Sequence, residues 1–132
     1  MKLITRDTDY AIRAICCIAQ SKKKVVSVRS LTKALNIPRP FLRKILQILN
    51  KENILDSYKG AGGGFSLAEK VKNISIFDLI EIFQGSFKMT GHKFKNKVCP
   101  HTKKCKLKGK LDTIETDVIT KLKAINIADL LN

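Results

Sequence analysis

The sequence predicts a mainly α-helical fold with one small β-hairpin and a long C-terminal helix. Apolar residues recur at helical spacing through most of the 132-residue chain. One glycine-rich turn separates two short runs that favour strands, and a stripe of apolar residues lies near the C-terminus. Apolar residues make up 44% of the chain, which is enough to build a buried core and is not typical of a disordered chain.

The first helix is expected from about Thr8 to Ala19, with Thr8 or Asp7 as its cap. Its apolar face consists of residues at helical spacing: Tyr10, Ala14, Ile15 and Ile18. Within this helix, Cys16 and Cys17 are interpreted as small buried side chains, which is the usual role of cysteines in such a position. Val25 and Val26 then indicate a very short extended segment.

Two shorter helices follow, separated by a tight break. Ser27 is a suitable N-cap for a helix over Val28–Leu35, and the break at Asn36-Ile37-Pro38 ends it. The next helix is expected from Pro40 to about Lys51, with a broad apolar face of Phe41, Leu42, Ile45, Leu46, Ile48 and Leu49. Because cations lie largely off that face, the pair of helices is typical of a helix-turn-helix.

A hairpin is expected next, with strands at Ile54–Tyr58 and Phe65–Leu67. Its tip is Lys59-Gly60-Ala61-Gly62-Gly63-Gly64, and four glycines exceed what a turn requires. The excess favours a backbone that approaches another surface closely. Together with the two short helices, the hairpin predicts a winged helix-turn-helix, the first domain, over residues 1–85.

A further helix is expected between Ser75, which can form a capping box with Asp78, and Gly85, which ends the helix. The C-terminal part of the chain follows it. A lysine-rich loop with two cysteines spans residues 86–107, and residues 108–132 form a last helix and tail, the helix itself running from Lys108 to Ala124. Its apolar stripe steps by three or four residues through Leu107, Leu111, Ile114, Val118, Leu122 and Ile125. This period is typical of a coiled-coil seam and favours a homodimer, although the helix could instead fold back on its own domain.

The net charge of the chain indicates the class of molecule that it binds. The chain carries 26 Lys and Arg against 11 Asp and Glu, a formal net charge of +15. Such an excess favours nucleic acid, although a lysine-rich solvated surface is the simpler alternative. The N-terminus has no apolar run typical of a signal peptide and no segment is apolar enough to span a membrane, so we expect a cytoplasmic protein with reduced cysteines. No nucleophile–base pair, phosphate loop or HExxH motif indicates an enzyme.

The residues expected to contact double-stranded DNA belong to the two short helices and the hairpin tip. The second of these helices should enter the major groove with its N-terminal end first, where arginines suit guanine edges. The predicted contacts are Arg29, Lys33, Arg39, Pro40, Arg43, Lys44, Lys59, Gly60, Gly62 and Gly63. The alternative class is a nucleic-acid-binding protein without sequence preference, held by lysines alone.

Several of these segments resemble the Rrf-two family of bacterial regulators, the group that contains IscR and NsrR. The similar segments are Met1–Thr5, Thr8–Ala14, Ile37–Leu46, the wing Lys59–Phe65 and the closing Ile127–Leu131. The resemblance implies a dimeric winged-helix regulator that binds a palindromic operator. The wing arginine of the family is Lys59 here, which keeps the charge and loses the planar fork.

The same resemblance implies a sensor in the cysteine loop. Relatives that bind an iron–sulfur cluster use three cysteines, of which Cys99 and Cys105 match the last two. His92 stands near the place of the first, and Asp9 resembles the remote carboxylate ligand of the nitric-oxide-sensing members. These four residues could hold a [2Fe–2S] cluster, and nearby lysines would favour thiolates.

Three alternatives to the cluster stay open: a zinc site of His92, Cys99, His101 and Cys105, a Cys99–Cys105 thiol switch, and a loop that senses nothing. Asp9 has its own alternative, since an acidic side chain at a helix start stabilises the helix dipole.

Overall fold

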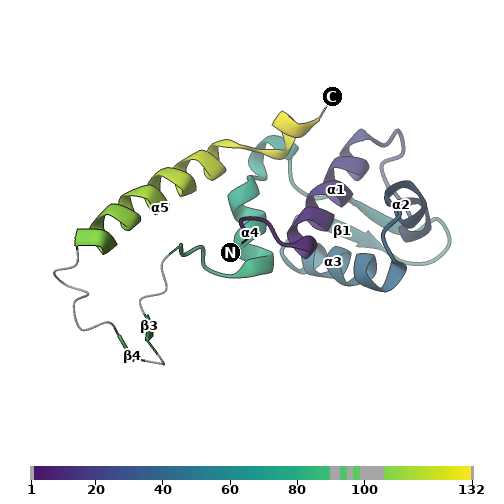
Figure 1. Cartoon of the computed structure of the whole chain (residues 1–132). Coiled ribbons are helices and arrows are strands. Elements are labelled where there is room, and N and C mark those ends of the chain that lie inside the picture. The colour runs from purple at the N-terminus through teal and green to yellow at the C-terminus, as the bar shows by residue number, and fades with distance from the viewer. Residues whose placement is uncertain (1, 90–92, 95–96, 99–105, 132) are drawn as a thin grey trace.

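The computed structural model describes residues 2–89, 93–94, 97–98 and 106–131. It contains a helical body with one hairpin, from which a long helix projects (Figure 1). The elements in chain order are α1 (Arg6–Gln20), α2 (Val28–Leu35), α3 (Arg39–Lys51), β1 (Leu55–Tyr58), β2 (Gly64–Leu67), the 3-10 turn η1 (Val71–Asn73), α4 (Ile76–Gln84), β3 (Lys93–Phe94), β4 (Lys97–Val98), α5 (Lys106–Ala124) and the 3-10 turn η2 (Ile127–Leu130). The predicted class, mainly helical with a small hairpin, is confirmed.

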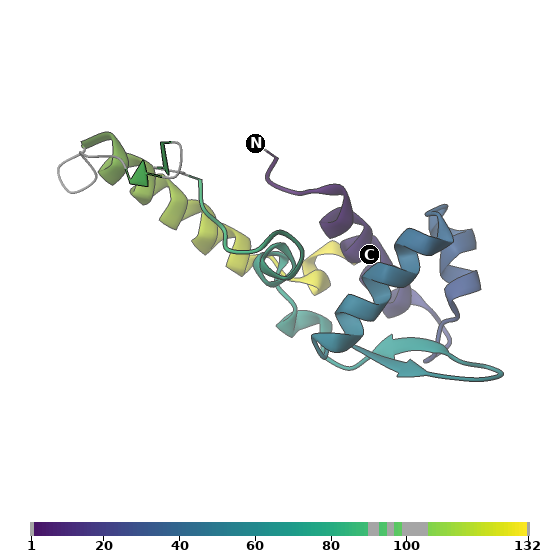
Figure 2. The same ribbon diagram turned by 90° about the horizontal axis from the view of Figure 1, so that it is seen from below.

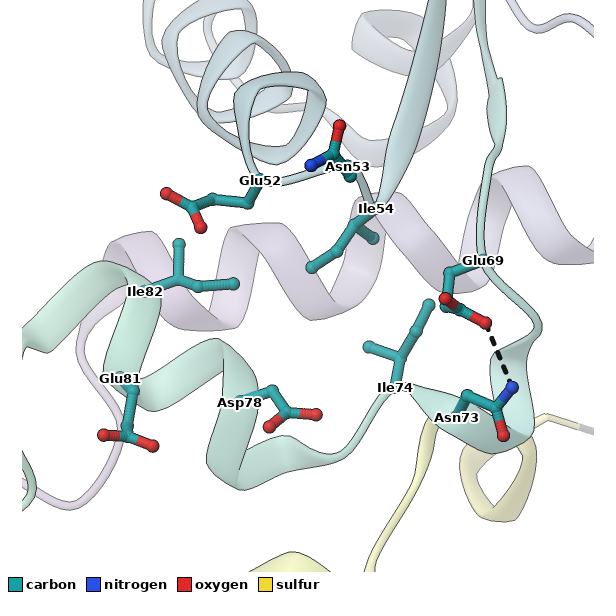
Figure 3. A pocket seen from close by; sticks show the side chains of 9 residues that line it. All are labelled: Glu52, Asn53, Ile54, Glu69, Asn73, Ile74, Asp78, Glu81 and Ile82. Carbon is teal, nitrogen blue, oxygen red and sulfur yellow. Dashed lines mark hydrogen bonds between the residues drawn. The ribbon is translucent and has the colours of Figure 1, made fainter.

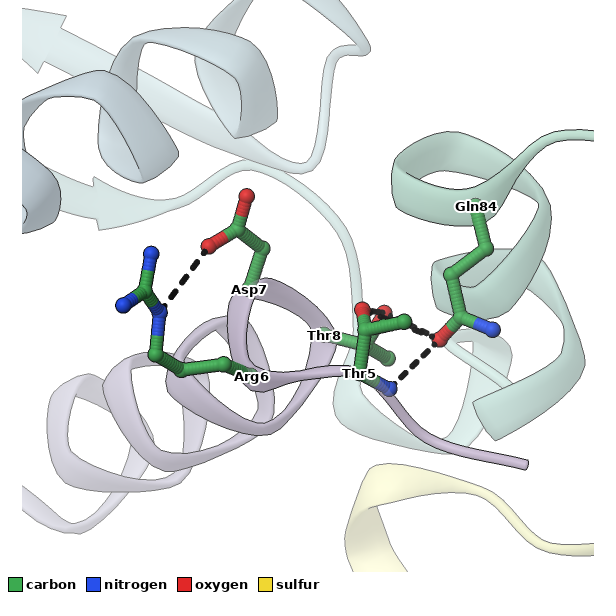
Figure 4. A network of polar contacts seen from close by, with 5 residues as sticks. All are labelled: Thr5, Arg6, Asp7, Thr8 and Gln84. Atoms are coloured by element: carbon green, nitrogen blue, oxygen red, sulfur yellow. Dashed lines mark hydrogen bonds and ion pairs between the residues drawn. The ribbon is translucent and has the colours of Figure 1, made fainter. Parts of the chain in front are cut away.

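Helix α1 begins two residues earlier than predicted, and neither Thr8 nor Asp7 caps it. The N-cap position is Thr5, and Thr8 lies within the helix with a fully buried side chain. The buried Thr8 hydroxyl donates a 2.6 Å hydrogen bond to the amide oxygen of Gln84 at the end of α4 (Figure 4). The same oxygen accepts from the Thr5 backbone N–H at 3.0 Å, so this polar cluster ties the start of α1 to the end of α4.

Helices α2 and α3 form around the core as their sequences predict. The Ser27 hydroxyl accepts from the Ser30 backbone N–H, and Asn36 ends α2 in the left-handed conformation with φ of 55°. Helix α3 starts at Arg39, so Pro40 occupies its first turn, where a missing N–H costs no hydrogen bond. The apolar face of α3 is buried through Leu42, Ile45, Leu46 and Leu49.

Phe41 departs from the predicted apolar face of α3. Its side chain is 44% exposed, although the neighbouring Leu42 is completely buried. The reason is its position on the helix, because Phe41 points toward the start of α1, where the Arg6 guanidinium lies 4.8 Å from the ring centroid. A cation above the ring face compensates for part of this exposure.

The hairpin is antiparallel and rests on the body through one extra bridge. Leu55 pairs with Leu67 and Tyr58 with Gly64 across its two strands. Val26 forms two backbone hydrogen bonds with Phe65, of 2.8 and 2.9 Å, which confirms the short extended segment before α2. The base of the hairpin is thereby fixed against the body.

The C-terminal elements bring the chain back to the body. The reciprocal capping box of Ser75 and Asp78 starts α4, and Gly85 follows its last residue. Helix α5 contacts α4 near its own C-terminal end, where Leu122 is buried, and extends outward from there (Figure 1). The predicted loop between α4 and α5 includes the short pair β3 and β4. Among the described residues, no helix has the length and apolar character needed to cross a bilayer.

Candidate nucleic-acid interface

A cationic groove lies between α3, the start of α2 and the hairpin. Its volume is about 500 Å³. Four cations line it and come from all three elements: Arg29, Arg39, Arg43 and Lys59. Gly60 and Gly63 of the hairpin tip line it as well. The groove therefore joins Arg39 and Arg43 of α3 to Lys59 of the hairpin on one side of the molecule, as expected from the sequence.

The spacing of residues on α3 explains this placement. Arg39, Arg43 and Gln47 follow one another at intervals of four, so they share one stripe along the helix. The buried face holds the helix by its leucines and isoleucines, and this orientation leaves the stripe beside the hairpin. Pro40 and Lys44 are exposed on α3 outside the residues that line the groove.

A second hollow continues the cationic surface along α2. It has a volume of about 470 Å³ and is lined by Arg29, Lys33 and Arg39 together with Thr32 and Asn36. Arg29 and Arg39 line both hollows, so Lys33 is connected to the groove through them. Nearly all the cations that the sequence indicated on α2, α3 and the hairpin thus line two adjoining hollows.

The four glycines of the tip are explained by backbone conformation and by contacts within this chain. Gly60 and Gly62 have φ of 90° and 76°, which other residues rarely adopt. A Cβ at Gly63 would lie 2.3 Å from the Tyr58 carbonyl oxygen, and one at Gly64 would lie 2.2 Å from the Val26 carbonyl oxygen. The glycine content therefore gives no separate argument for approach to DNA, contrary to the reasoning from sequence.

Sequence reasoning missed several groove residues that carry no charge. Gln47, Ser27, Ser57 and Tyr58 line the groove and are polar at their ends. The spacing of Gln47 from Arg43 could have identified it. Asn50 serves structure, because its side-chain amide donates a 2.9 Å hydrogen bond to the Leu55 carbonyl and holds β1 against α3.

A cavity of about 610 Å³ near α4 has the opposite charge. Four of its lining residues are acidic: Glu52, Glu69, Asp78 and Glu81 (Figure 3). A hydrogen bond from Asn73 lowers the pKa of the Glu69 carboxyl, so this group is ionised near neutral pH. Such a cavity repels phosphates, which leaves the groove beside α3 as the candidate surface for a polyanion.

Three of the four predicted cluster ligands, His92, Cys99 and Cys105, lie outside the described residues. Asp9 is described, and its carboxylate forms a 3.0 Å ion pair with Arg13 one turn further along α1. Within the part of the chain that the structure describes, no three His, Cys, Asp or Glu side chains are placed to share a metal ion.

The two cysteines of α1 are half-buried and pack against the hydrophobic core. Burial raises the pKa of the Cys16 thiol, and the adjacent Cys17 adds to the shift. This environment agrees with the predicted structural role.

Comparison with known proteins identifies the family. The model of the Rrf2 family, described as iron-dependent transcriptional regulators, matches residues 4–132. This chain belongs to the Rrf2 family of transcriptional regulators. It is 33% identical over 132 residues to an HTH-type transcriptional regulator of Aquifex aeolicus, covering 93% of this chain and 87% of that protein. It is 28% identical over 130 residues to NsrR of Halalkalibacterium halodurans, covering 97% and 89%.

Solved structures of the Rrf2 family share the fold. The IscR structure of T. potens matches with a TM-score of 0.74 at 23% identity, covering 98% of this chain and 85% of that one. CymR of B. subtilis, the global cysteine regulator, matches with a TM-score of 0.76 at 19% identity, covering 98% and 96%. The expectation of a DNA-binding regulator rather than an enzyme is confirmed by membership in this family.

Proposed function

We propose that this Rrf2-family chain binds a palindromic operator as a homodimer in the cytoplasm and reads its sequence with α3 and the hairpin. The observation that carries the proposal is the shared groove, which unites Arg39 and Arg43 of α3 with Lys59 of the hairpin. In a helix-turn-helix, the second helix enters the major groove. The hairpin then lies over the adjacent backbone, where Lys59 is suited to phosphates or to a narrow minor groove.

The residues divide into two roles. Arg39 and Arg43 have the planar fork that pairs with guanine O6 and N7, and Lys44 reaches either a base or a phosphate. Arg29 and Lys33 of α2 contact the backbone and fix the register, while Gly60, Gly62 and Gly63 allow the tight turn that presents Lys59. Pro40 stabilises the first turn of α3, from which the arginines project.

Selection of bound duplexes from a random pool tests this proposal. The full chain should enrich one palindromic motif and bind it roughly a thousandfold or more tightly than a shuffled duplex at the same salt concentration. Arg43→Gln should relax preference at one base position and cost about 1–3 kcal/mol there. The matched control is Lys72→Gln, an exposed charge in η1 outside the groove. Equal affinity of the wild type for all duplexes would instead indicate the non-specific binder.

The dimer proposal depends on α5. Leu107 and Ile114 of its apolar stripe are 62% and 48% exposed, although Leu122 of the same stripe is buried against the body. Val118 and Leu122 therefore pack on their own domain, while Leu107 and Ile114 are exposed among the described residues, as a seam with a second copy requires. Ile114→Glu should convert a dimer into a monomer in sedimentation experiments, while Thr113→Glu, on an exposed position beside it, should not.

For the sensor, we propose that Cys99 and Cys105, with His92 and Asp9, hold a [2Fe–2S] cluster. Asp9 supports this in part, because its carboxylate is on the surface, with a side chain 43% exposed. The Arg13 ion pair is also exposed, so exchanging it for another ligand costs little. Such a cluster would supply redox and nitric-oxide chemistry, and its loss would shift the equilibrium between dimer conformations with different operator affinity.

The metal content and absorption spectrum of anaerobically purified protein distinguish the alternatives for this loop. A cluster predicts iron and sulfide in equal amounts and visible absorption that Cys99→Ser abolishes. Zinc without iron would indicate the zinc site, and a reversible disulfide without metal would indicate the thiol switch. Equal operator affinity in the oxidised, reduced and metal-free forms would contradict every sensing proposal and leave DNA binding unaffected.

A further inference from the structure

A cation at the start of α1 lies beside α3, on the flank away from the hairpin. Arg6 is the first residue of α1, and its guanidinium carbon is 4.8 Å from the centroid of the Phe41 ring in the first turn of α3. It is also 6.0 Å from the ring centroid of Tyr10. Two aromatic rings from different helices thus hold this guanidinium at the N-terminal end of α3.

The guanidinium remains available to a ligand. The Arg6 side chain is 62% exposed, and its ion pair from Nε to the neighbouring Asp7 is long at 3.8 Å. Figure 4 shows Arg6 directed away from the polar cluster of Thr5, Thr8 and Gln84. An arginine stacked on an aromatic face keeps its N–H groups directed outward in the plane of the guanidinium, where they can donate to an anion.

The contact with Arg6 explains why Phe41 is exposed. A 44% exposed phenylalanine in the first turn of α3 contributes little to the core, which its neighbours Leu42 and Ile45 fill. A flat apolar ring is, however, a suitable support for a guanidinium at the surface. Phe41 therefore orients Arg6 more than it stabilises the domain.

The position of Arg6 matters because of the shape of duplex DNA. An α-helix with its side chains is about as wide as the major groove, roughly 12 Å, so a helix inside the groove has a phosphate backbone on each side. Figure 2 shows the hairpin on one side of α3 and the start of α1 on the other. The groove that Arg29, Arg43 and Lys59 line lies on the hairpin side of α3.

We propose that Arg6, oriented by Phe41, binds a phosphate of the DNA strand opposite to the strand that the hairpin side contacts. This inference rests on the proposed docking of α3 in the major groove. Two phosphate contacts on opposite walls would clamp α3 in the groove and fix its rotation about its own axis. Arg6 carries no base information in this arrangement, so it adds affinity for every duplex by the same factor.

The salt dependence of binding tests the phosphate contact. Loss of one contact per protomer lowers the slope of log K against log salt by about 1.8 for a dimer. Between 50 and 200 mM salt, wild-type protein should therefore lose about twelvefold more affinity than Arg6→Gln. The matched control is Lys123→Gln, which removes the same charge from a cation that lies 5.0 Å from the Phe77 ring between α5 and α4. The control should keep the wild-type slope.

Neutralised phosphates locate the contact. Duplexes that each carry one ethylated phosphate are compared for their affinity. At one phosphate, ethylation should lower the affinity of the wild type and leave the affinity of Arg6→Gln unchanged. Lys59→Gln should likewise become insensitive to ethylation at one phosphate, and that phosphate should lie on the opposite strand. Phe41→Leu should weaken wild-type binding but have no further effect in the Arg6→Gln background, since Phe41 acts through Arg6.

The outcomes distinguish failure of the Arg6 contact from failure of the proposed function. If Arg6→Gln unfolds at the wild-type temperature and keeps the wild-type slope, while the wild type still selects a motif, only the Arg6 contact is wrong. If Arg6→Gln loses thermal stability and keeps the slope, the Arg6–Phe41 stacking is purely structural and the inference is also wrong. A wild type that binds no duplex would overturn the proposed function together with this inference.

Discussion

Gly64 lies where the hairpin passes closest to the backbone of Val26. Gly64 opens β2 with φ of 152°, and a Cβ there would lie 2.2 Å from the Val26 carbonyl oxygen and 2.6 Å from its carbonyl carbon. Both atoms belong to backbone that cannot rotate out of the way. In Gly64→Ala, the strand must therefore move away from Val26 by nearly 1 Å, since real Cβ atoms essentially never lie within 3.0 Å of another backbone atom.

That movement affects two backbone hydrogen bonds between Val26 and Phe65, at 2.8 and 2.9 Å. Each contributes about 1 kcal/mol, and the positive φ adds about 1–2 kcal/mol for a residue with a Cβ. The expected loss of unfolding free energy is about 3–4 kcal/mol. For a domain of this size, it corresponds to a fall in Tm of about 10–15 °C.

Gly62→Ala is the matched control within the same hairpin. Gly62 also has a positive φ, 76°, but a Cβ there meets no atom within 4 Å. Gly62→Ala should cost only the term for the positive φ, about 1–2 kcal/mol, and lower Tm by about 4–8 °C. Thermal unfolding followed by circular dichroism measures both variants. Equal falls in Tm for Gly62→Ala and Gly64→Ala would refute the steric argument, since both share the backbone term.

Three further predictions concern the body of the protein. Gln84→Leu removes the acceptor for the buried Thr8 hydroxyl and should cost about 2 kcal/mol in urea unfolding, part of which Thr8→Val restores in the same background. Ser75→Ala removes half of a capping box and should cost about 1 kcal/mol by the same measurement, whereas an unchanged midpoint would show that Asp78 alone suffices. The raised pKa of Cys16 should make its alkylation at pH 8 slower than that of free cysteine by mass spectrometry. Because the folded pKa is raised, the stabilisation from the neutral thiol is complete below the ordinary pKa and is lost as pH rises through the raised one.

Much of the body follows from local signals in the sequence. Ser27, Asn36 and the Ser75–Asp78 pair each have a distinct capping chemistry, and the helices begin or end where these residues indicate. The cations Arg39 and Arg43 share one stripe because they are four residues apart, and the buried apolar face of α3 fixes the direction in which this stripe faces. For this reason the placement of Arg39 and Arg43 in one groove with the hairpin could be expected before the structure was known.

What the sequence did not predict depends on contacts distant in the chain. Thr8 looks like a cap, but its hydroxyl bonds to Gln84, 76 residues away, so the helix begins earlier. Phe41 satisfies the apolar period of α3 and nevertheless faces Arg6 at the surface. Gly63 and Gly64 are required because a Cβ at either position would collide with the carbonyl oxygen of Tyr58 or of Val26, which lie close only in the folded protein. No local pattern contains this information.

Lysine acetylation footprinting tests most directly where DNA binds. The full chain is acetylated with and without its selected duplex, and mass spectrometry reports the modification at each lysine. We expect Lys33, Lys44 and Lys59 to lose reactivity when the duplex is present, because they lie on the side of α2, α3 and the hairpin. Lys72 in η1 and Lys123 at the end of α5 should react equally in both samples. Protection of Lys72 or Lys123 with unchanged reactivity at Lys59 would contradict the assignment of this surface to DNA.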